Sequence, residues 1–171
     1  MDGHRFYIQQ ITFNGIAYTK GEFADSLDDF GIACKEWPFK LYPEAKDVAE
    51  TDYTDEHGKD AYIPSHAVLK DYDIESEFIV NGTSLSDVQT KIKTFFDFLY
   101  GFNSGGSARL AVYDEHTGIG RKDIRLVEVD NDLWWNDDSD DEKIAIFKVK
   151  FHVYDPKTDV QLSNNNDELV W

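Results

Sequence analysis

Residues 69–101 decide the fold, and they read LKDYDIESEFIVNGTSLSDVQTKIKTFFDFLYG. In the first part, up to Val80, apolar side chains nearly alternate with charged ones. A period of two residues is typical of a half-buried β-strand, because successive side chains point to opposite faces of a sheet. Asn81 and Gly82 are turn-forming residues and end the pattern. The stretch therefore begins with one long strand that has a core side and a solvent side.

A helix is predicted next, over about 85–100. Ser84 is a natural N-cap, and Asp87 completes a variant of the capping box with a shorter carboxylate. Gly101 supplies the stop, since glycine readily adopts the left-handed conformation of a helix C-cap. One face carries apolar side chains at helical spacing, namely Leu85, Val88, Ile92, Phe95, Phe96 and Leu99. Burial of this face contributes on the order of 10 kcal/mol before the entropy cost, which indicates a core helix.

Further segments on both sides of this stretch carry strand patterns. Near the N-terminus, residues 5–18 predict a tight hairpin, because Asn14 and Gly15 tolerate the positive φ of a type I′ turn. Beyond the helix, strands are predicted at 109–113, 124–129 and 144–154. We therefore predict the α+β class: mainly antiparallel β-sandwich or barrel-like sheets, one flanking α-helix, and a long projecting loop or hairpin.

One domain is expected over residues 1–160, since a chain of this length suits a single core. Residues 37–66 interrupt the strand pattern, with three of the four prolines and a run of acidic side chains. We interpret this segment as an irregular acidic insertion, and long loops of this kind are usually functional or mobile. Residues 161–171 form a polar C-terminal tail, expected to fray unless its last three residues dock on the domain.

The formal net charge is −17, from 34 acidic against 17 basic residues. A free-standing nucleic-acid-binding protein normally has the opposite sign, because it must neutralise phosphates. An anionic membrane surface would repel this chain as well. The first residues show no signal region, and no apolar run approaches the ~20 residues of a membrane span. We therefore expect a soluble protein that is made in the cytoplasm and does not bind membranes.

The sequence shows no catalytic signature, and we predict no enzyme, no cofactor and no metal site. Cys34, the only cysteine, lacks a neighbouring motif and is expected to be a packed side chain. The histidines form no pair at helical i, i+4 spacing that would suit zinc. The acidic run 136–142 lacks the central glycine and the distal glutamate of an EF-hand loop, so a solvated charge run is preferred over a calcium site.

Two acidic loops remain as candidate contact surfaces. The first spans 44–60 and includes Asp52, Asp55 and Glu56. The second spans 130–142, and its candidate residues are Trp134, Trp135, Asp137, Asp138, Asp140 and Asp141. Neighbouring residues of a strand point to opposite faces, so one of the two tryptophans is expected in the core and the other in solvent.

The order of elements from about 67 to 160 matches a known pattern. A strand leads through Asn81 and Gly82 to the helix, LAVYD follows at 110–114, and the last strand reads FKVKFHVYDP at 147–156. This order resembles the N-terminal ring domain of phage distal tail proteins and, more broadly, the tail-tube family. The opening ITFNG at 11–15, followed by FGI at 30–32, is similar to the N-terminal hairpin of that family.

The resemblance implies a structural protein of a phage or prophage tail, made in the bacterial cytoplasm and found in the virion tail. Its partners would be copies of itself in a ring, commonly a hexamer, and other tail proteins, with DNA as a repelled passenger. The two acidic loops would then line the channel or form the contact between rings; the alternative is that they only keep the protein soluble. Six copies carry 6 × −17 = −102 formal charges, so association should strengthen as salt screens them. The alternative prediction is a soluble non-catalytic binding module that uses Trp134 and Trp135 to bind carbohydrate or a protein partner.

Overall fold

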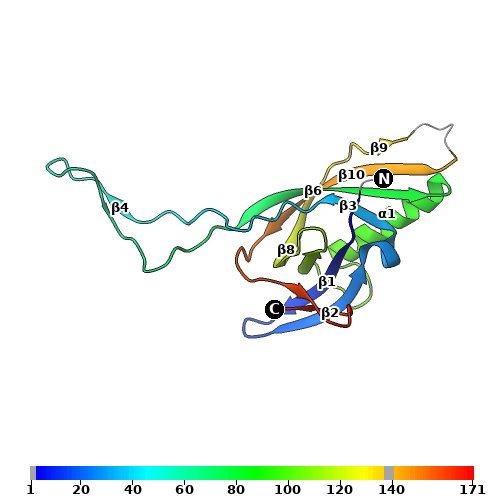
Figure 1. Cartoon of the computed structure of the whole chain (residues 1–171), viewed down its shortest axis with the longest axis horizontal. Helices are drawn as coiled ribbons and strands as arrows, with labels where there is room; N and C mark the ends of the chain where they lie inside the picture. The colour runs from blue at the N-terminus through cyan, green and yellow to red at the C-terminus, as the bar shows by residue number, and fades with distance from the viewer. Residues whose placement is uncertain (1–2, 137–140) are drawn as a thin grey trace.

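The computed structural model describes residues 3–136 and 141–171. Within them, an eight-stranded antiparallel sheet forms the body, one α-helix packs against it, and a long arm projects to one side (Figure 1). The strands follow the order β2-β1-β7-β8-β10-β6-β3, and β9 pairs with β10. Their bounds are β1 Phe6–Phe13, β2 Tyr18–Asp25, β3 Ile32–Glu36, β6 Tyr72–Gly82, β7 Leu110–Asp114, β8 Ile119–Val129, β9 Trp134–Trp135 and β10 Lys143–Val153.

The sheet closes on itself. His4, just before β1, exchanges two backbone hydrogen bonds with Cys34 of β3, with N···O distances of 2.7 and 2.9 Å. This bridge joins the first and last strands of the path β1-β7-β8-β10-β6-β3. The strand β2 pairs with β1 beyond this bridge, over the rest of the same strand edge. The α+β prediction is therefore confirmed, and of its two forms the protein has the barrel-like one.

The helix α1 (Leu85–Tyr100) has the predicted bounds and caps. Ser84 Oγ accepts a hydrogen bond from Asp87 N at 3.2 Å, and Gly101 ends the helix at a φ of 75°. The predicted apolar face is nearly right, but Leu85 is 50% exposed and Phe98 is buried in its place.

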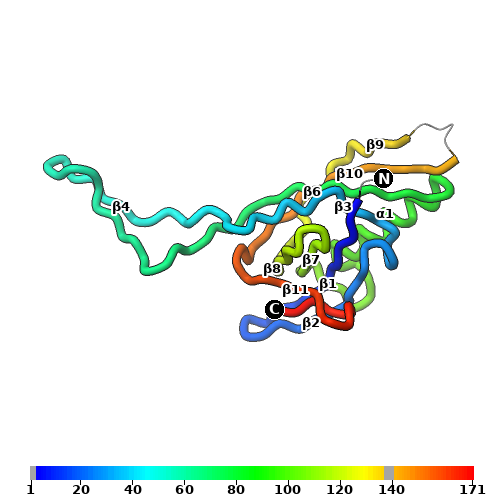
Figure 2. Tube along the Cα trace, viewed as in Figure 1, coloured from blue at the N-terminus to red at the C-terminus, as the bar shows by residue number. Residues whose placement is uncertain are grey.

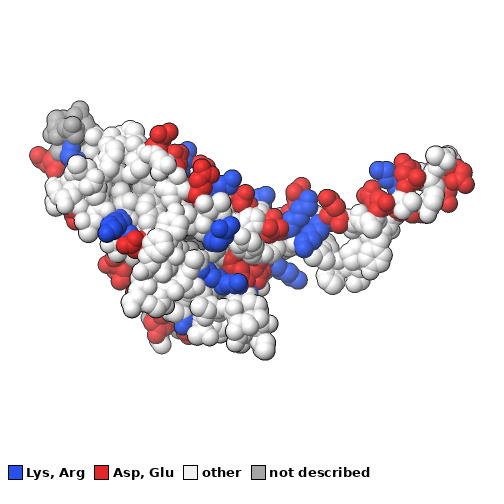
Figure 3. All heavy atoms as spheres, turned by 180° about the vertical axis from the view of Figure 1, so that it is seen from behind, with Lys and Arg blue, Asp and Glu red and all other residues white. Residues whose placement is uncertain are grey.

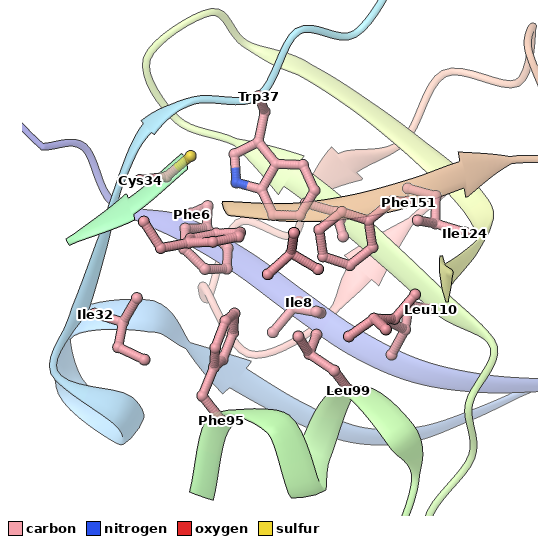
Figure 4. Packing of buried hydrophobic residues seen from close by; sticks show 14 of the residues in the cluster. Phe6, Ile8, Ile32, Cys34, Trp37, Phe95, Leu99, Leu110, Ile124 and Phe151 are labelled. Carbon is pink, nitrogen blue, oxygen red and sulfur yellow. The ribbon is translucent and has the colours of Figure 1, made fainter. Parts of the chain in front are cut away.

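Aromatic rings fill the centre of the barrel (Figure 4). Phe78 of β6 lies at the hub, with ring centroids 5.2 to 5.6 Å from those of Phe95, Trp37, Phe147 and Phe6. All five side chains are almost completely buried. Such edge-to-face and tilted pairs add directional attraction to the area that they bury, so α1 and the strands share one core.

The N-terminal hairpin differs from the prediction in its turn. Four residues, Asn14–Ala17, form the loop, and Asn14 N donates to Ala17 O at 3.3 Å. The Asn14 side-chain oxygen accepts from the backbone N–H groups of Ile16 and Ala17, each at 2.9 Å. These side-chain bonds favour the wider loop over a two-residue type I′ turn. As a result, Ile16 is 91% exposed and β2 starts at Tyr18.

The C-terminal tail is not frayed. It forms the hairpin β11 (Gln161–Leu162) and β12 (Leu169–Val170), which lies beside β1 and β2 (Figure 2). Leu169 is fully buried, and its N–H donates to the side-chain oxygen of Gln9 at 2.9 Å. Residues 161–171 therefore pack on the body instead of forming a separate tail.

A buried charge network holds the start of the tail. Lys122 Nζ lies 2.8 Å from the Asp155 carboxylate and 2.8 Å from the Tyr18 hydroxyl, while Asp155 also accepts a hydrogen bond from Thr158 Oγ1 at 2.8 Å. Burial lowers the pKa of Lys122, but these bonds outweigh it and the net direction is upward. For Asp155, burial raises the pKa, yet the bonds from Lys122 and Thr158 bring it down to about 2. Both groups are thus charged at neutral pH.

Candidate assembly interface

The arm is defined here as residues 40–71. It differs from the predicted acidic insertion of 37–66 at both ends, because Trp37 and Phe39 are buried in the core and the projecting part continues to residue 71. It is a two-limbed ribbon that leaves the body and returns to it (Figure 1). Backbone hydrogen bonds join the limbs, from Lys70 N to Glu44 O at 2.8 Å and from Tyr62 N to Ala49 O at 2.9 Å. Near the tip, β4 (Glu50–Thr51) pairs with β5 (Asp60–Ala61). The predicted long projecting hairpin is therefore present.

The base of the arm is fixed to the body. Trp37, just before the arm, stacks on Phe39 inside the core, with ring centroids 5.5 Å apart. Lys40 N donates to the Tyr72 hydroxyl at 3.1 Å, and Lys40 O accepts from Arg121 Nη2 at 3.3 Å. Because these contacts use the core and the first strand after the arm, the two limbs leave the body from a defined point.

The limbs of the arm expose apolar side chains. Tyr42 is 86%, Ile63 79% and Tyr62 73% exposed. A hollow of about 460 Å³ lies between the limbs, lined by Ala45, Lys46, Asp47, Val48, Ala49, Tyr62, Ile63, Pro64, Ala67 and Val68. Exposed apolar surface of this kind is unfavourable in water and marks interaction sites. The arm gains little from folding on itself and is suited to packing against another surface.

The tip of the arm is acidic. Asp52, Asp55 and Glu56 are exposed around its turn, and Figure 3 shows carboxylates gathered at the far end of the arm. Among the described residues, none of the three has a cationic group within 4.0 Å, whereas Glu50 pairs with Lys59 at 3.6 Å. These predicted site residues therefore form one cluster on a projecting tip.

The second predicted surface, residues 130–142, lies on the body and is described only in part. Trp134 and Trp135 form β9 beside β10, where Trp135 packs against the core and Trp134 is 55% exposed. The expectation of one ring on each face is confirmed. Asp141 is exposed next to β10, while Asp137, Asp138 and Asp140 lie outside the described residues. Because Trp134 is on the body and Asp55 at the tip of the arm, these site residues do not form a single patch.

The lone thiol is a core group. Cys34 is 1% exposed, and its Sγ donates to Glu36 O at 2.8 Å. Burial raises its pKa strongly, so the reactive thiolate is disfavoured. Over residues 3–136 and 141–171, no group of three or more histidine, cysteine or acidic side chains has the arrangement of a metal site. Within the same ranges, no helix is both long enough and apolar enough to cross a membrane.

A histidine clamp at the base of the arm has no signature in the sequence. His152 of β10 lies between two carboxylates, with Nε2 2.5 Å from Asp71 and Nδ1 2.5 Å from Asp73. Partial burial lowers the pKa of His152, but the hydrogen bonds to Asp73 and Asp71 outweigh it and raise the pKa. The same bonds lower the pKa of each carboxyl group. The alternation of β10 predicts that His152 faces outward. It does not predict which carboxylates His152 contacts, because these are set by the register of β10 with β6.

Comparison with known proteins gives no assignment. No protein-family model matches the chain, and no curated protein matches its sequence.

Proposed function

We propose that this chain is a structural protein of a phage or prophage tail that assembles into a closed ring around the DNA channel. The observation that carries the proposal is the arm: a projecting ribbon with exposed apolar side chains, anchored to the barrel. Contacts between an arm and a different surface of the next copy are heterologous, and heterologous contacts close into rings when the rotation allows it.

The charge of the chain supports the same proposal. With −17 formal charges, copies repel one another at long range, so a ring must be held by apolar area or by local pairs of opposite charge. The arm offers both, since Tyr62 and Ile63 are exposed and the tip is acidic. In this proposal the remaining carboxylates repel the phosphates of DNA, which can then slide through the channel.

Removal of the arm tests the proposal. Because Lys70 N bonds Glu44 O, residues 45–69 can be replaced by Asn-Gly without separating the two limbs at the base. We expect the wild-type chain to form oligomers of several copies in sedimentation velocity, and the shortened chain to remain monomeric. Near-ultraviolet circular dichroism and the melting temperature serve as controls, because the core lies outside the arm. A shortened chain that still forms the same oligomer contradicts the proposal.

The second candidate is a non-catalytic binding module for carbohydrate or a protein partner. It is favoured by Trp134, a large ring on the body with 55% of its surface exposed. A binding module would be monomeric at all salt concentrations, and a glycan or peptide ligand would change its tryptophan fluorescence. Trp134→Ala should abolish that change and leave a ring unaffected, so the two measurements separate the candidates.

A further inference from the structure

A cationic groove lies on the body where three strands meet. The backbone register places Leu110 of β7 and Val153 of β10 on either side of Ile124 of β8. The residues next to this row therefore converge, although they are far apart in the sequence. They surround a groove of about 400 Å³, lined by Ala108, Arg109, Asp123, Ile124, Arg125 and Tyr154.

Arg125 is the exposed charge of this groove. Its Nε donates to the Tyr154 hydroxyl at 3.3 Å, and its two Nη groups make no hydrogen bond among the described residues. No carboxylate lies within 4.0 Å of Arg125 in the part of the chain that the structure describes, although the chain has twice as many acids as bases. A planar guanidinium with free Nη groups is suited to bind a carboxylate through paired hydrogen bonds.

The other arginine of the groove, Arg109, is paired with the carboxylate of Asp123. Arg109 Nη1 lies 2.7 Å from one oxygen of Asp123. The other oxygen accepts from Tyr18 Oη at 2.5 Å and from Lys122 Nζ at 3.2 Å. Asp123 is thus held by three donors and is not available to neutralise Arg125. The groove retains a positive charge next to the exposed Tyr154 ring.

The complementary group is the tip of the arm. Residues 50–60 contain five acidic residues and one lysine, which gives −5 + 1 = −4. Asp52, Asp55 and Glu56 have no cationic partner among the described residues. The chain therefore carries unpaired carboxylates on a projecting tip and an unpaired guanidinium in a groove of its body.

We infer that this groove binds the acidic arm tip of a second copy of the chain, through Arg125 and the carboxylates of Asp55 and Glu56. The inference rests on the proposed function and names the contact that would join neighbouring copies. The outgoing limb, residues 40–55, has a reach of at most about 50 Å. A body of this size has a radius of gyration of about 14 Å. Figure 1 shows the tip well beyond its own body, so it can reach another copy.

A charge swap tests the inference. R125E and the double substitution D55K/E56K each place like charges at every contact, and each should weaken association by about tenfold or more per contact. The two variants in an equimolar mixture should associate again. In alternating order, the carboxylate introduced by R125E then faces the lysine-bearing tip, while Arg125 of the other variant faces a wild-type tip. D55K/E56K also lowers the net negative charge, which by itself would favour association. A loss of association in this variant would therefore come from the lost contact and not from general repulsion between the chains.

Lys93→Glu is the matched control, since Lys93 is exposed on α1 and has no ion pair among the described residues. It changes the net charge as R125E does and should associate as the wild type does. Sedimentation velocity measures association, and the melting temperature shows that each variant is folded. If R125E associates as the wild type does, or if the mixture stays dissociated, the groove contact is overturned. The ring proposal stands in either case. A wild-type chain that never associates overturns both.

Discussion

Nε2 of His152 lies 2.5 Å from the Asp71 carboxylate, so the last strand of the barrel is tied to the residue at which the arm returns to the body. Asp73 occupies the other ring nitrogen, at 2.5 Å from Nδ1. Both nitrogens can face carboxylates as donors only when the imidazole is protonated. The contact between His152 and the base of the arm is therefore linked to pH.

The pKa of His152 should lie above its usual value of 6.5. A raised pKa means that the stabilisation is present in full below pH 6.5 and is lost as pH rises through the folded value. The lowered pKa values of Asp71 and Asp73 keep it present above pH 3.8 and remove it in stronger acid. An NMR titration of the imidazole should show the raised pKa, and Asp71→Asn should lower it. An unchanged titration in Asp71→Asn contradicts the clamp.

The core and the arm should respond differently to truncation. Phe78→Ala removes the hub of the aromatic core and should lower the free energy of unfolding by about 3–5 kcal/mol. Tyr62→Ala, on the exposed arm, should change it by less than about 0.5 kcal/mol. Urea denaturation measures both. A large loss of stability in Tyr62→Ala would mean that the arm packs on its own body.

The C-terminal hairpin should contribute to stability. Leu169 is fully buried against the strands β1 and β7, so Leu169→Ala should cost about 2–5 kcal/mol. Asn165→Ala, at the exposed turn of the same hairpin, serves as the control and should have little effect. Equal melting temperatures for the wild type and Leu169→Ala would show that the hairpin detaches in solution.

The Lys122–Asp155 pair should stabilise the fold at neutral pH. Asp155→Ala should lower the free energy of unfolding by about 2 kcal/mol, as expected for a hydrogen-bonded charge. The pKa of Asp155 is lowered to about 2, so this contribution is present above pH 3.8 and is lost as pH falls through about 2. The difference between the two proteins, measured in urea, should shrink over that range. A gap independent of pH contradicts the assignment. Asp52→Ala is the control, because this exposed carboxylate has no cationic partner among the described residues.

Salt should act on association in two opposite ways. From about 0.01 M to 0.15 M the screening length falls from about 30 Å to 8 Å, which weakens repulsion between chains that each carry −17 formal charges but not contacts of a few ångströms. Association should therefore strengthen over this range. Towards about 1 M, where the screening length is about 3 Å, the Arg125 contact should weaken and association should decline. Sedimentation velocity across this series measures both effects, and a steady fall from the lowest salt would contradict the repulsion argument.

Elements whose causes are local could be predicted from the amino-acid sequence alone. The alternation from Leu69 to Val80 predicts a strand, found as β6 from Tyr72 onward, and the cap at Ser84 predicts α1, because each pattern acts within a few residues. Prolines and clustered acids likewise marked the projecting arm. The two tryptophans of β9 divide between the core and solvent as the pleat of a strand requires.

Closure of the barrel, docking of the C-terminal hairpin and formation of the groove depend on contacts between distant parts of the chain. His4 pairs with Cys34, which lies far along the chain, and no local pattern signals that bridge. The tail docks because Gln9, distant in sequence, accepts a hydrogen bond from Leu169. Arg109, Arg125 and Tyr154 come together through the register of β7, β8 and β10. Strand register depends on pairing between segments far apart in the chain, and no single segment encodes it alone.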